Sequence, residues 1–419
     1  MKSIKLCFLA AVALLFCWRT CAQIYDTNGE YVQTFAGSGE VGYLDGQGQL
    51  TKFSDPFQIV ADTSSNLYVL DDGNYLIRKI TPSGMVSTFV GGGTATTGYG
   101  TNVSLNGYFL GSMVIDHSNT IWLLVANGDG YSDEGYLNIS TNGYVSSQQY
   151  ITNLDYQNGI CFDSANNLYY PAENQIWRYN PSTGVSQPFA GNGTAGYVDG
   201  SGTVFPEFND PTALACDEAN NIYVWDFGNY RIRRIDQSQN ITTIAGNGIP
   251  EFGNLDGVGT NTSFLNVSSM FADNAGNIYF ACGGSIRKMN AQTNVVTMAG
   301  SFTQGGYMNG AGDLALFEGA SGACMSGGTF YVADSENERI RDITFNPQPQ
   351  VVSGANLGIA SYAGVTITGA VGRTYEIQSS PDMNTWTTVA TVLLTSSPYL
   401  WIDKNPISGN KFYQAVLLP

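Results

Sequence analysis

The amino-acid sequence predicts an all-β fold, and three features carry this prediction. Apolar residues make up 43% of the chain and charged residues only 12%, which is typical of a folded protein. The 50 glycines, 25 tyrosines and 21 phenylalanines suit short strands joined by tight turns. No segment has the apolar spacing of a long amphipathic helix.

The first 22 residues have the organisation of a secretory signal peptide. Lys2 and Lys5 precede an apolar run over residues 6–18, which is too short to cross a bilayer. We therefore expect a secreted chain that begins at Gln23 and is extracellular or cell-surface associated, with the periplasm as an alternative. A lipoprotein anchored through Cys21 stays open as a second interpretation. No other segment is predicted to cross a membrane.

The main feature of the sequence is an internal repeat. The best copies are NLYVLDDGNYLIRKIT at 66–81, NNIYVWDFGNYRIRRID at 220–236 and TFYVADSENERIRDIT at 329–344, and weaker copies lie at 119–141, 166–180 and 276–290. Each copy carries one anchoring aromatic residue: Tyr68, Trp122, Tyr169, Tyr223, Tyr279 and Tyr331. Six copies of this length predict a ring of four-stranded sheets, a six-bladed β-propeller over residues 23–345.

A glycine-rich phrase runs ahead of the repeated core. It reads TFAGSGEVGYLDGQG at 34–48 and FAGNGTAGYVDGSG at 189–202, and F-x-D-P follows at 53–56 and 208–211. Together these phrases resemble the NHL-repeat family in its glycine-rich bacterial secreted form, over residues 31–344. The resemblance implies an inner strand after D-P, a second strand with Y-V-x-D, a third with R-I-x-x-I and an outer strand that leads to A-G.

The two ends of the repeat region suggest how the ring closes. The last copy stops after its third strand, at Thr344, and an outer strand without a blade of its own, residues 31–35, precedes the first copy. We expect this N-terminal strand to complete the sixth blade, which would leave no exposed sheet edge at the closure. After the proline-rich segment NPQPQ, residues 346–419 alternate like strands around Trp386 and resemble a fibronectin-type-III-like module, a small β-sandwich.

The charges exclude some partners. The signal peptide holds three of the 17 basic residues and none of the 34 acidic ones, so the mature chain is more acidic than the formal charge of −17 for the whole chain. Such a chain repels nucleic acids and acidic membranes. Most basic residues fall in third strands, and Asp71, Asp226 and Asp334 occupy matching positions in second strands. We therefore predict Asp–Arg pairs within the blades and no nucleic-acid partner.

Histidine chemistry is limited to one residue. Some NHL propellers are amidating lyases that hold zinc through several histidines, and this chain has only His117. The register places His117 in a solvent-exposed turn at the end of the channel opposite its mouth. Asp62, Asp116, Asp163, Asp217 and Asp273 fall in the same type of turn, where we predict that they cap the backbone.

Two groups of oxygen-bearing side chains are candidates for a binding site. In the first, Asp55, Asp210 and Asn266 share one column where inner strands begin, and Glu318 stands just before that column. Propeller enzymes that resemble lactonases hold a divalent cation there, and Ca²⁺ prefers such oxygen ligands. Turn chemistry is the alternative, because Asp55 and Asp210 precede prolines.

The second group is an expanded loop in the second blade. Asn127, Asp129, Asp133 and Glu134 place oxygens at spacings that suit Ca²⁺, although they do not match an EF-hand. A flexible acidic loop that holds no ion is the default interpretation. We interpret the glycine-rich loops with Asp45, Asp199 and Asp256, on the mouth side of the ring, as glycine turns first and as a ligand surface second.

The four cysteines of the mature chain are Cys161, Cys216, Cys282 and Cys324. An even number in an exported chain is compatible with disulfides. The repeat register, however, places Cys161 and Cys216 on opposite faces of their strands, so we predict free buried thiols.

The sequence favours a secreted, monomeric, non-catalytic scaffold that binds an extracellular protein or glycan through the loop face of the propeller. The alternative is a Ca²⁺-dependent lactonase- or lyase-like enzyme that acts at the mouth of the channel.

Overall fold

The computed structural model describes residues 23–26, 29–127, 134–155, 159–203, 206–250, 254–345, 364–367, 370–382, 384–395, 399–402 and 412–418. The proposed signal peptide lies outside them. The chain divides into two compact units, Met1–Gln348 and Pro349–Pro419. No α-helix occurs in the described residues, and none of their helices is long and apolar enough to span a membrane.

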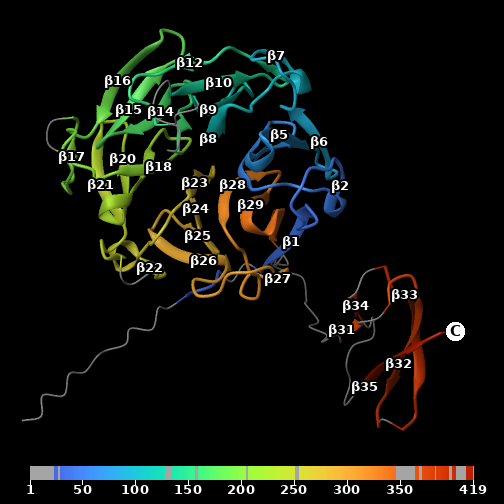
Figure 1. Ribbon diagram of the computed structural model, residues 1–419. Coiled ribbons are helices and arrows are strands. Elements are labelled where there is room, and N and C mark those ends of the chain that lie inside the picture. Colours follow the sequence, from blue (N-terminus) through green and yellow to red (C-terminus); the bar gives the residue numbers. More distant parts are fainter. Residues whose placement is uncertain are drawn as a thin grey trace, which may run out of the picture. The chain divides into compact units, whose positions relative to one another are not determined.

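The strands of the first unit form six antiparallel sheets that follow one another around a ring (Figure 1). We number the sheets in the order of their inner strands. The inner strands are β3 (Pro56–Ala61), β8 (Tyr108–Ile115), β13 (Cys161–Phe162), β18 (Pro211–Cys216), β23 (Ser269–Ala272) and β28 (Ala320–Ser326). The second strands are β4 (Leu67–Asp71), β9 (Ile121–Asn127), β14 (Leu168–Ala172), β19 (Ile222–Asp226), β24 (Ile278–Cys282) and β29 (Thr329–Asp334).

The outer half of each sheet continues this order. The third strands are β5 (Leu76–Ile80), β10 (Gly135–Ile139), β15 (Gln175–Asn180), β20 (Arg231–Ile235), β25 (Ser285–Met289) and β30 (Arg339–Phe345). The fourth strands are β6 (Met85–Val90), β11 (Tyr144–Val145), β16 (Val185–Ala190), β21 (Asn240–Ala245), β26 (Asn294–Gly300) and β1 (Glu30–Ala36). In the second sheet, β12 (Gln149–Tyr150) also pairs with β10.

The expectation of four strands per sheet is wrong for five of the six sheets. The glycine-rich loop adds a short fifth strand outside the fourth: β2 (Gly46–Gln47), β7 (Gly98–Tyr99), β17 (Gly200–Ser201), β22 (Gly257–Val258) and β27 (Gly310–Ala311). The loop must turn sharply to reach this position. Gly37 begins one such turn at φ 96°, and a Cβ there would collide with the Glu338 carbonyl, so only glycine fits.

Short 3₁₀ helices complete the connections. Three of them join second to third strands, namely η2 (Asp72–Asn74), η4 (Phe227–Asn229) and η7 (Ser335–Asn337). Three more follow fifth strands: η1 (Gly48–Leu50), η3 (Gly100–Asn102) and η6 (Gly259–Asn261).

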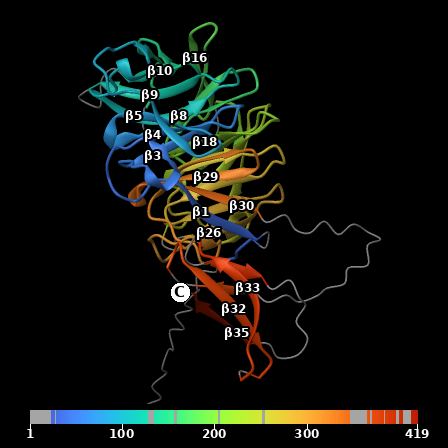
Figure 2. The ribbon, with the colours of Figure 1, turned by 90° about the vertical axis from the view of Figure 1, so that its right-hand side faces the viewer.

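The N-terminal strand closes the sixth sheet. β1 pairs antiparallel with β30, with Tyr31 opposite Thr344 and Val32 opposite Ile343, and Figure 2 shows the two strands side by side. The segment before it is held on the fifth sheet, because the Ile24 N–H donates to Asp256 at 2.8 Å. The first described residues therefore connect two neighbouring sheets.

The core of this unit lies between consecutive sheets. The anchoring aromatic of each second strand faces the following sheet, so Tyr68 shares a cluster with Met113 and Trp122 shares one with Phe162. All five residues of β4 are buried, because the strand is covered on both faces by neighbouring sheets.

The second unit is small and contains two antiparallel sheets in its described part. β31 (Gly364–Ile367) pairs with β34 (Tyr399–Ile402), and β32 (Thr374–Ser380) lies between β33 (Thr387–Leu393) and β35 (Phe412–Leu417). Ile377, Val392 and Leu394 are buried in its core.

Candidate functional site

The six inner strands surround a cavity of about 740 Å³. Every one of the six contributes to its lining, from Gln58 in β3 to Cys324 in β28. The lining continues past the ends of the strands to His117, Asp273 and Gly328. We call the side where inner strands begin the start end, and the side where they turn into second strands the turn end. The cavity reaches the turn end.

The walls of this cavity are strand edges. Each inner strand is the last strand of its sheet, so one edge has a sheet partner and the other faces the cavity. An edge of this kind presents backbone N–H and C=O groups in alternation. In the described residues the inner strands therefore offer both donors and acceptors to a molecule in the cavity.

Direct bonds between neighbouring inner strands lie toward the start end. The Gly159 N–H donates to the Thr212 carbonyl at 2.7 Å, and the Ser321 hydroxyl donates to the Phe57 carbonyl at 2.8 Å. Gly322 permits the close approach, because a Cβ there would lie 2.7 Å from the Phe57 oxygen. At this end, these bonds tie the third sheet to the fourth and the sixth sheet to the first.

The lining carries almost no charge. Its described residues include no lysine or arginine, and their ionisable groups apart from thiols are His117 and Asp273. Asp273 is occupied by its own turn, where it accepts hydrogen bonds from the Asn277 side chain at 2.8 Å and from the Tyr279 hydroxyl at 2.9 Å. Although burial alone would raise it, these hydrogen bonds lower the pKa of Asp273. The cavity therefore suits an uncharged ligand.

His117 is in the exposed turn that the sequence predicts, and its Nδ1 lies 2.9 Å from the Asn166 Oδ1. It also borders the cavity, because the cavity reaches the end that the sequence interpretation placed opposite the mouth. The prediction for the turn aspartates is confirmed. Asp62, for example, accepts from the Asn66 N–H at 2.8 Å and from the Tyr68 hydroxyl at 3.1 Å.

The four predicted ligand residues lie at the start end, and none lines the cavity. Asp55, Asp210, Asn266 and Glu318 are all exposed. Asp55 and Asp210 have left-handed φ values of 52° and 53°, and no hydrogen bond joins any two of the four in the described structure. Their backbone N–H groups donate to Glu338 at 2.7 Å and to Asn174 at 3.1 Å respectively, as turn residues do.

Asp55 nevertheless belongs to an acidic group between the sixth and first sheets. Burial and the nearby Asp55 and Asp71 raise the pKa of Asp72 to about 6. Burial and the charge of Glu336 raise the pKa of Asp55, and burial also raises that of Glu338. Crowded carboxylates at this position repel one another.

No three His, Cys, Asp or Glu side chains among the described residues are placed so that they could hold a metal ion. Of the expanded loop, Asp129 and Asp133 lie outside the described residues. Asn127 ends β9, and Glu134 precedes β10. Burial, with the charge of Asp155, raises the pKa of Glu134.

The predicted Asp–Arg pairs are confirmed. Arg78 lies 2.7 Å from Asp71, Arg233 lies 2.7 Å from Asp226, and Arg341 lies 2.5 Å from Asp334. All six side chains are fully buried. Burial raises the pKa of Asp71, whereas hydrogen bonds from Ser54, Asn74 and Arg78 act in the opposite direction.

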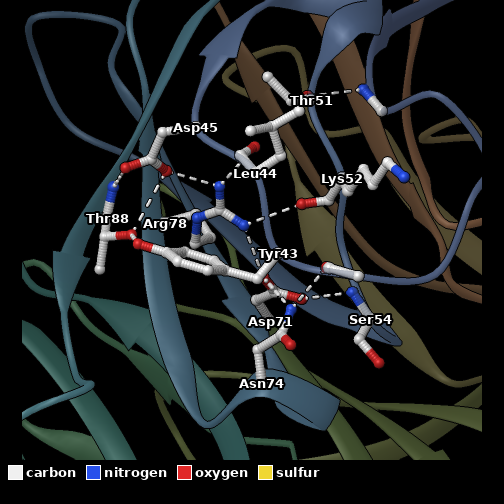
Figure 3. A network of polar contacts seen from close by, with 12 residues as sticks. Tyr43, Leu44, Asp45, Thr51, Lys52, Ser54, Asp71, Asn74, Arg78 and Thr88 are labelled. Carbon is white, nitrogen blue, oxygen red and sulfur yellow. Dashed lines mark hydrogen bonds and ion pairs between the residues drawn. The ribbon is translucent and has the colours of Figure 1, made fainter.

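The structure gives Asp45, Asp199 and Asp256, whose loops the sequence predicts as glycine turns first and a ligand surface second, a structural role: their carboxylates bind buried arginines. Asp45 contacts Arg78 at 2.6 Å, as Figure 3 shows, and Asp199 contacts Arg233 at 2.8 Å. Asp256 contacts Arg287 at 2.9 Å. A signal for this was present in the sequence: each of these aspartates precedes a copy with an arginine in the middle of its third strand.

The argument that separated Cys161 from Cys216 is wrong. Both residues belong to the cluster between the third and fourth sheets. In a ring of sheets, one face of each sheet packs against the opposite face of the next sheet. Cys161 and Cys216 occupy register positions one residue apart, so they point to opposite faces and meet between the two sheets. The four cysteines of the described residues are free thiols in the structure.

Comparison with known proteins supports a β-propeller-like fold. No protein-family model matches the chain. Protein SUPPRESSOR OF QUENCHING 1, chloroplastic, from Arabidopsis thaliana is 26% identical over 328 residues, which cover 74% of this chain but only 27% of that protein. A protein of unknown function from Bacteroides thetaiotaomicron has a similar structure, with a TM-score of 0.58, 17% identity and coverage of 75% of this chain and 76% of that one.

Two further solved structures are auxiliary nutrient binding proteins. That from Bacteroides ovatus has a TM-score of 0.56 and 17% identity, and that from Bacteroides thetaiotaomicron has a TM-score of 0.55 and 20% identity. Each alignment covers 75% of this chain and 76% of the other. At such identities the likeness concerns the fold.

Proposed function

We propose that this chain is a secreted, non-catalytic binding protein whose six-bladed, NHL-like propeller holds an uncharged glycan in its central cavity. The second unit is its C-terminal β-sandwich module. The observation that carries the proposal is the cavity of about 740 Å³ with neutral walls built from strand edges.

The chemistry of the walls favours a sugar over other neutral ligands. Backbone N–H and C=O groups on the inner edges can pair with the many hydroxyl groups of a glycan, which are both donors and acceptors. Ser112, Ser269 and Ser326 add hydroxyls to the lining, and Met113 and Met270 add apolar surface for the faces of sugar rings. The shared fold with auxiliary nutrient binding proteins supports the same class of function.

The test is calorimetric titration of the mature chain with a panel of neutral and acidic oligosaccharides. We expect at least one neutral oligosaccharide to bind and acidic ones to bind more weakly. Ser326→Trp, which fills the turn end of the cavity, should weaken binding at least about tenfold. Ser238→Trp is the matched control, because Ser238 is an exposed turn residue outside the cavity.

Two results would count against the proposal. One is the absence of binding across the neutral panel, and the other is unchanged affinity in Ser326→Trp. Capture of an extracellular protein that survives Ser326→Trp would instead favour recognition on the loop face.

The second candidate is a Ca²⁺-dependent lactonase- or lyase-like enzyme, and the acidic group around Asp55 is the observation in its favour. A bound cation would oppose both causes that raise the pKa of Asp72, first its burial and then the repulsion from Asp55 and Asp71. Calcium titration of the mature chain and of Asp72→Asn, with lactone hydrolysis measured in parallel, tests this candidate. It requires Ca²⁺ binding that Asp72→Asn weakens, together with turnover that a chelator abolishes.

A further inference from the structure

The interfaces between consecutive sheets repeat one pair of facing positions on the inner strands. The first position lies opposite the anchoring aromatic and faces the next sheet, and the second follows it by one residue and faces the previous sheet. Around the ring, the six facing pairs are Val60 and Ile115, Val114 and Phe162, Cys161 and Cys216, Ala215 and Ala272, Phe271 and Met325, and Cys324 and Ala61.

Five of these pairs contain at most one thiol, and the pair between the third and fourth sheets contains two. Cys161 lies opposite Tyr169 in the third sheet, and Cys216 lies opposite Ile222 in the fourth. Both side chains pack into one cluster with Leu214. The thiols therefore meet in the same way as the apolar pairs at the other interfaces.

The surroundings of the two thiols allow a reagent to reach them. Cys161 and Cys216 both line the central cavity, so a small molecule in the cavity lies beside them. Cys161 is 8% exposed, and Cys216 is more exposed. Burial, followed by the hydrogen bond with Cys216, raises the pKa of the Cys161 thiol well above its usual value, so reaction is expected to be slow at neutral pH.

The remaining two cysteines provide internal controls. Cys282 lies in the second strand of the fifth sheet, and Cys324 packs against Ala61 at the interface between the sixth and first sheets. Neither shares a hydrophobic cluster with another cysteine among the described residues.

We propose that Cys161 and Cys216 form a disulfide that links the third and fourth sheets through their inner strands. The two thiols lose two protons and two electrons as the S–S bond forms. The acceptor is the disulfide of a thiol–disulfide oxidoreductase or of oxidised glutathione, which is reduced to two thiols. The inference uses the expected export of the chain to an oxidising compartment, and it does not depend on the proposed ligand.

The link would attach to a sheet that lacks two features of the first sheet. The third sheet has no fifth strand in its described part, and its third strand carries Trp177 where the first sheet carries Arg78. The cysteines are 55 positions apart in the chain, so the bond would restrict a long loop of the unfolded state.

The experiment equilibrates the mature chain in a glutathione redox buffer, quenches it with an alkylating reagent under denaturing conditions and counts labelled thiols by mass. We expect two labelled thiols without prior reduction and four after reduction. Peptide mapping without reduction should recover the Cys161 peptide joined to the Cys216 peptide. Cys282→Ser/Cys324→Ser should keep the bond, and Cys216→Ala should lose it.

Thermal unfolding distinguishes the Cys161–Cys216 disulfide from incidental oxidation of other thiols. Reduction should lower the midpoint of thermal unfolding by several degrees in the wild type and leave that of Cys216→Ala unchanged. Four free thiols after equilibration, a mixed disulfide on Cys161 or Cys216 alone, or a bond to Cys282 or Cys324 would each overturn the proposal.

Discussion

Four sheets of the first unit bury an arginine in the middle of their third strand, and two sheets place apolar residues there. Arg78, Arg233, Arg287 and Arg341 are all fully buried, in the first, fourth, fifth and sixth sheets. The matching residues of the second and third sheets are Leu137 and Trp177, as the pairing of third with second strands shows.

The difference concerns how each sheet holds the loop that leads into it. Arg78 donates to the Lys52 carbonyl at 3.0 Å and to the Leu44 carbonyl at 3.1 Å, so its guanidinium holds both ends of that loop. It also lies 5.0 Å from the ring of Tyr43 and 5.1 Å from that of Phe53. One side chain thus joins the third strand, the second strand and the incoming glycine-rich loop.

The second and third sheets rely on aromatic packing instead. Trp122 stacks on Tyr136 at 4.3 Å between ring centroids and meets Phe162 edge-on at 5.2 Å. Thr97 occupies the position before β7 that Asp45 holds before β2. Without that carboxylate, an arginine in place of Leu137 would lack its counter-charge. The comparison indicates that the arginine and the loop aspartate act together as one stabilising unit, since the second sheet lacks both.

The strongest test of this unit inserts an arginine where the carboxylates are missing. Leu137→Arg should destabilise the protein by about 4 kcal/mol or more, because it buries an unpaired charge among apolar side chains. The measurement is urea-induced unfolding, with Leu137→Met as a size-matched control that should cost less than about 1.5 kcal/mol.

The triple variant Leu137→Arg/Val125→Asp/Thr97→Asp should recover part of the loss, because it supplies both counter-charges. A triple variant that is no more stable than Leu137→Arg would contradict the view that the arginine and its two aspartates act together.

The reverse experiment removes an arginine from the fourth sheet. Arg233→Met should cost about 3–5 kcal/mol, because Asp226 is left as an uncompensated buried carboxylate. Arg233→Met/Asp226→Leu should recover most of this loss, since neither charge remains. If the double variant were as unstable as the single one in urea unfolding, the loop contacts of Arg233 and not its charge would be decisive.

Within the arginine-containing sheets, the fifth differs from the first. Arg78 has two carboxylates, whereas Cys282 replaces the strand aspartate in the fifth sheet and leaves Arg287 with Asp256 as its one carboxylate partner among the described residues. Asp256 also accepts from the Ile24 N–H and from the Thr297 hydroxyl at 2.7 Å. Asp256→Asn should therefore cost about 2–3 kcal/mol, and Asp45→Asn less than about 1 kcal/mol.

Urea unfolding of the two variants measures this difference directly. Limited proteolysis near Ile24 should also be faster in Asp256→Asn, because the change weakens one of the bonds that hold the N-terminal segment on the fifth sheet. Equal losses of stability in the two variants would show that Asp71, the second carboxylate on Arg78, is not the reason why the first sheet tolerates Asp45→Asn.

The repeat made the sheets and the Asp71–Arg78 pair predictable, because both residues recur at fixed positions in paired strands. The contact of Asp45 with Arg78 was missed because the two residues are 33 positions apart and the fifth strand that follows Asp45, at two residues, is too short to show an alternating pattern. The cavity could not be predicted, since its size depends on how closely the six inner strands approach. The thiol pair was missed because strand register alone does not show which faces of neighbouring sheets meet.

Glu30, on the strand that closes the ring, is a buried carboxylate without an arginine. It extends the comparison to a buried acidic group that has no cationic partner of this kind, and here we expect the smallest effect. It is 4% exposed, and its Oε1 has no hydrogen-bond partner in the described structure. Burial, with the charge of Asp26 and against that of Lys288, raises the pKa of Glu30 to about 7.

Because the pKa of Glu30 in the folded state lies above its usual value of 4.5, the protonated form favours folding. This contribution is fully present below about pH 4.5 and is lost as the pH rises through about 7.

Glu30→Gln removes the titration, so it should be more stable than the wild type by about 1 kcal/mol at pH 8 and lose this advantage at pH 5. Thermal unfolding at both pH values measures the difference, and Glu218→Gln, at an exposed glutamate, is the control. An advantage of Glu30→Gln that is equal at pH 5 and pH 8 would contradict this prediction, because it would mean that the Glu30 carboxylate does not change its protonation across this range.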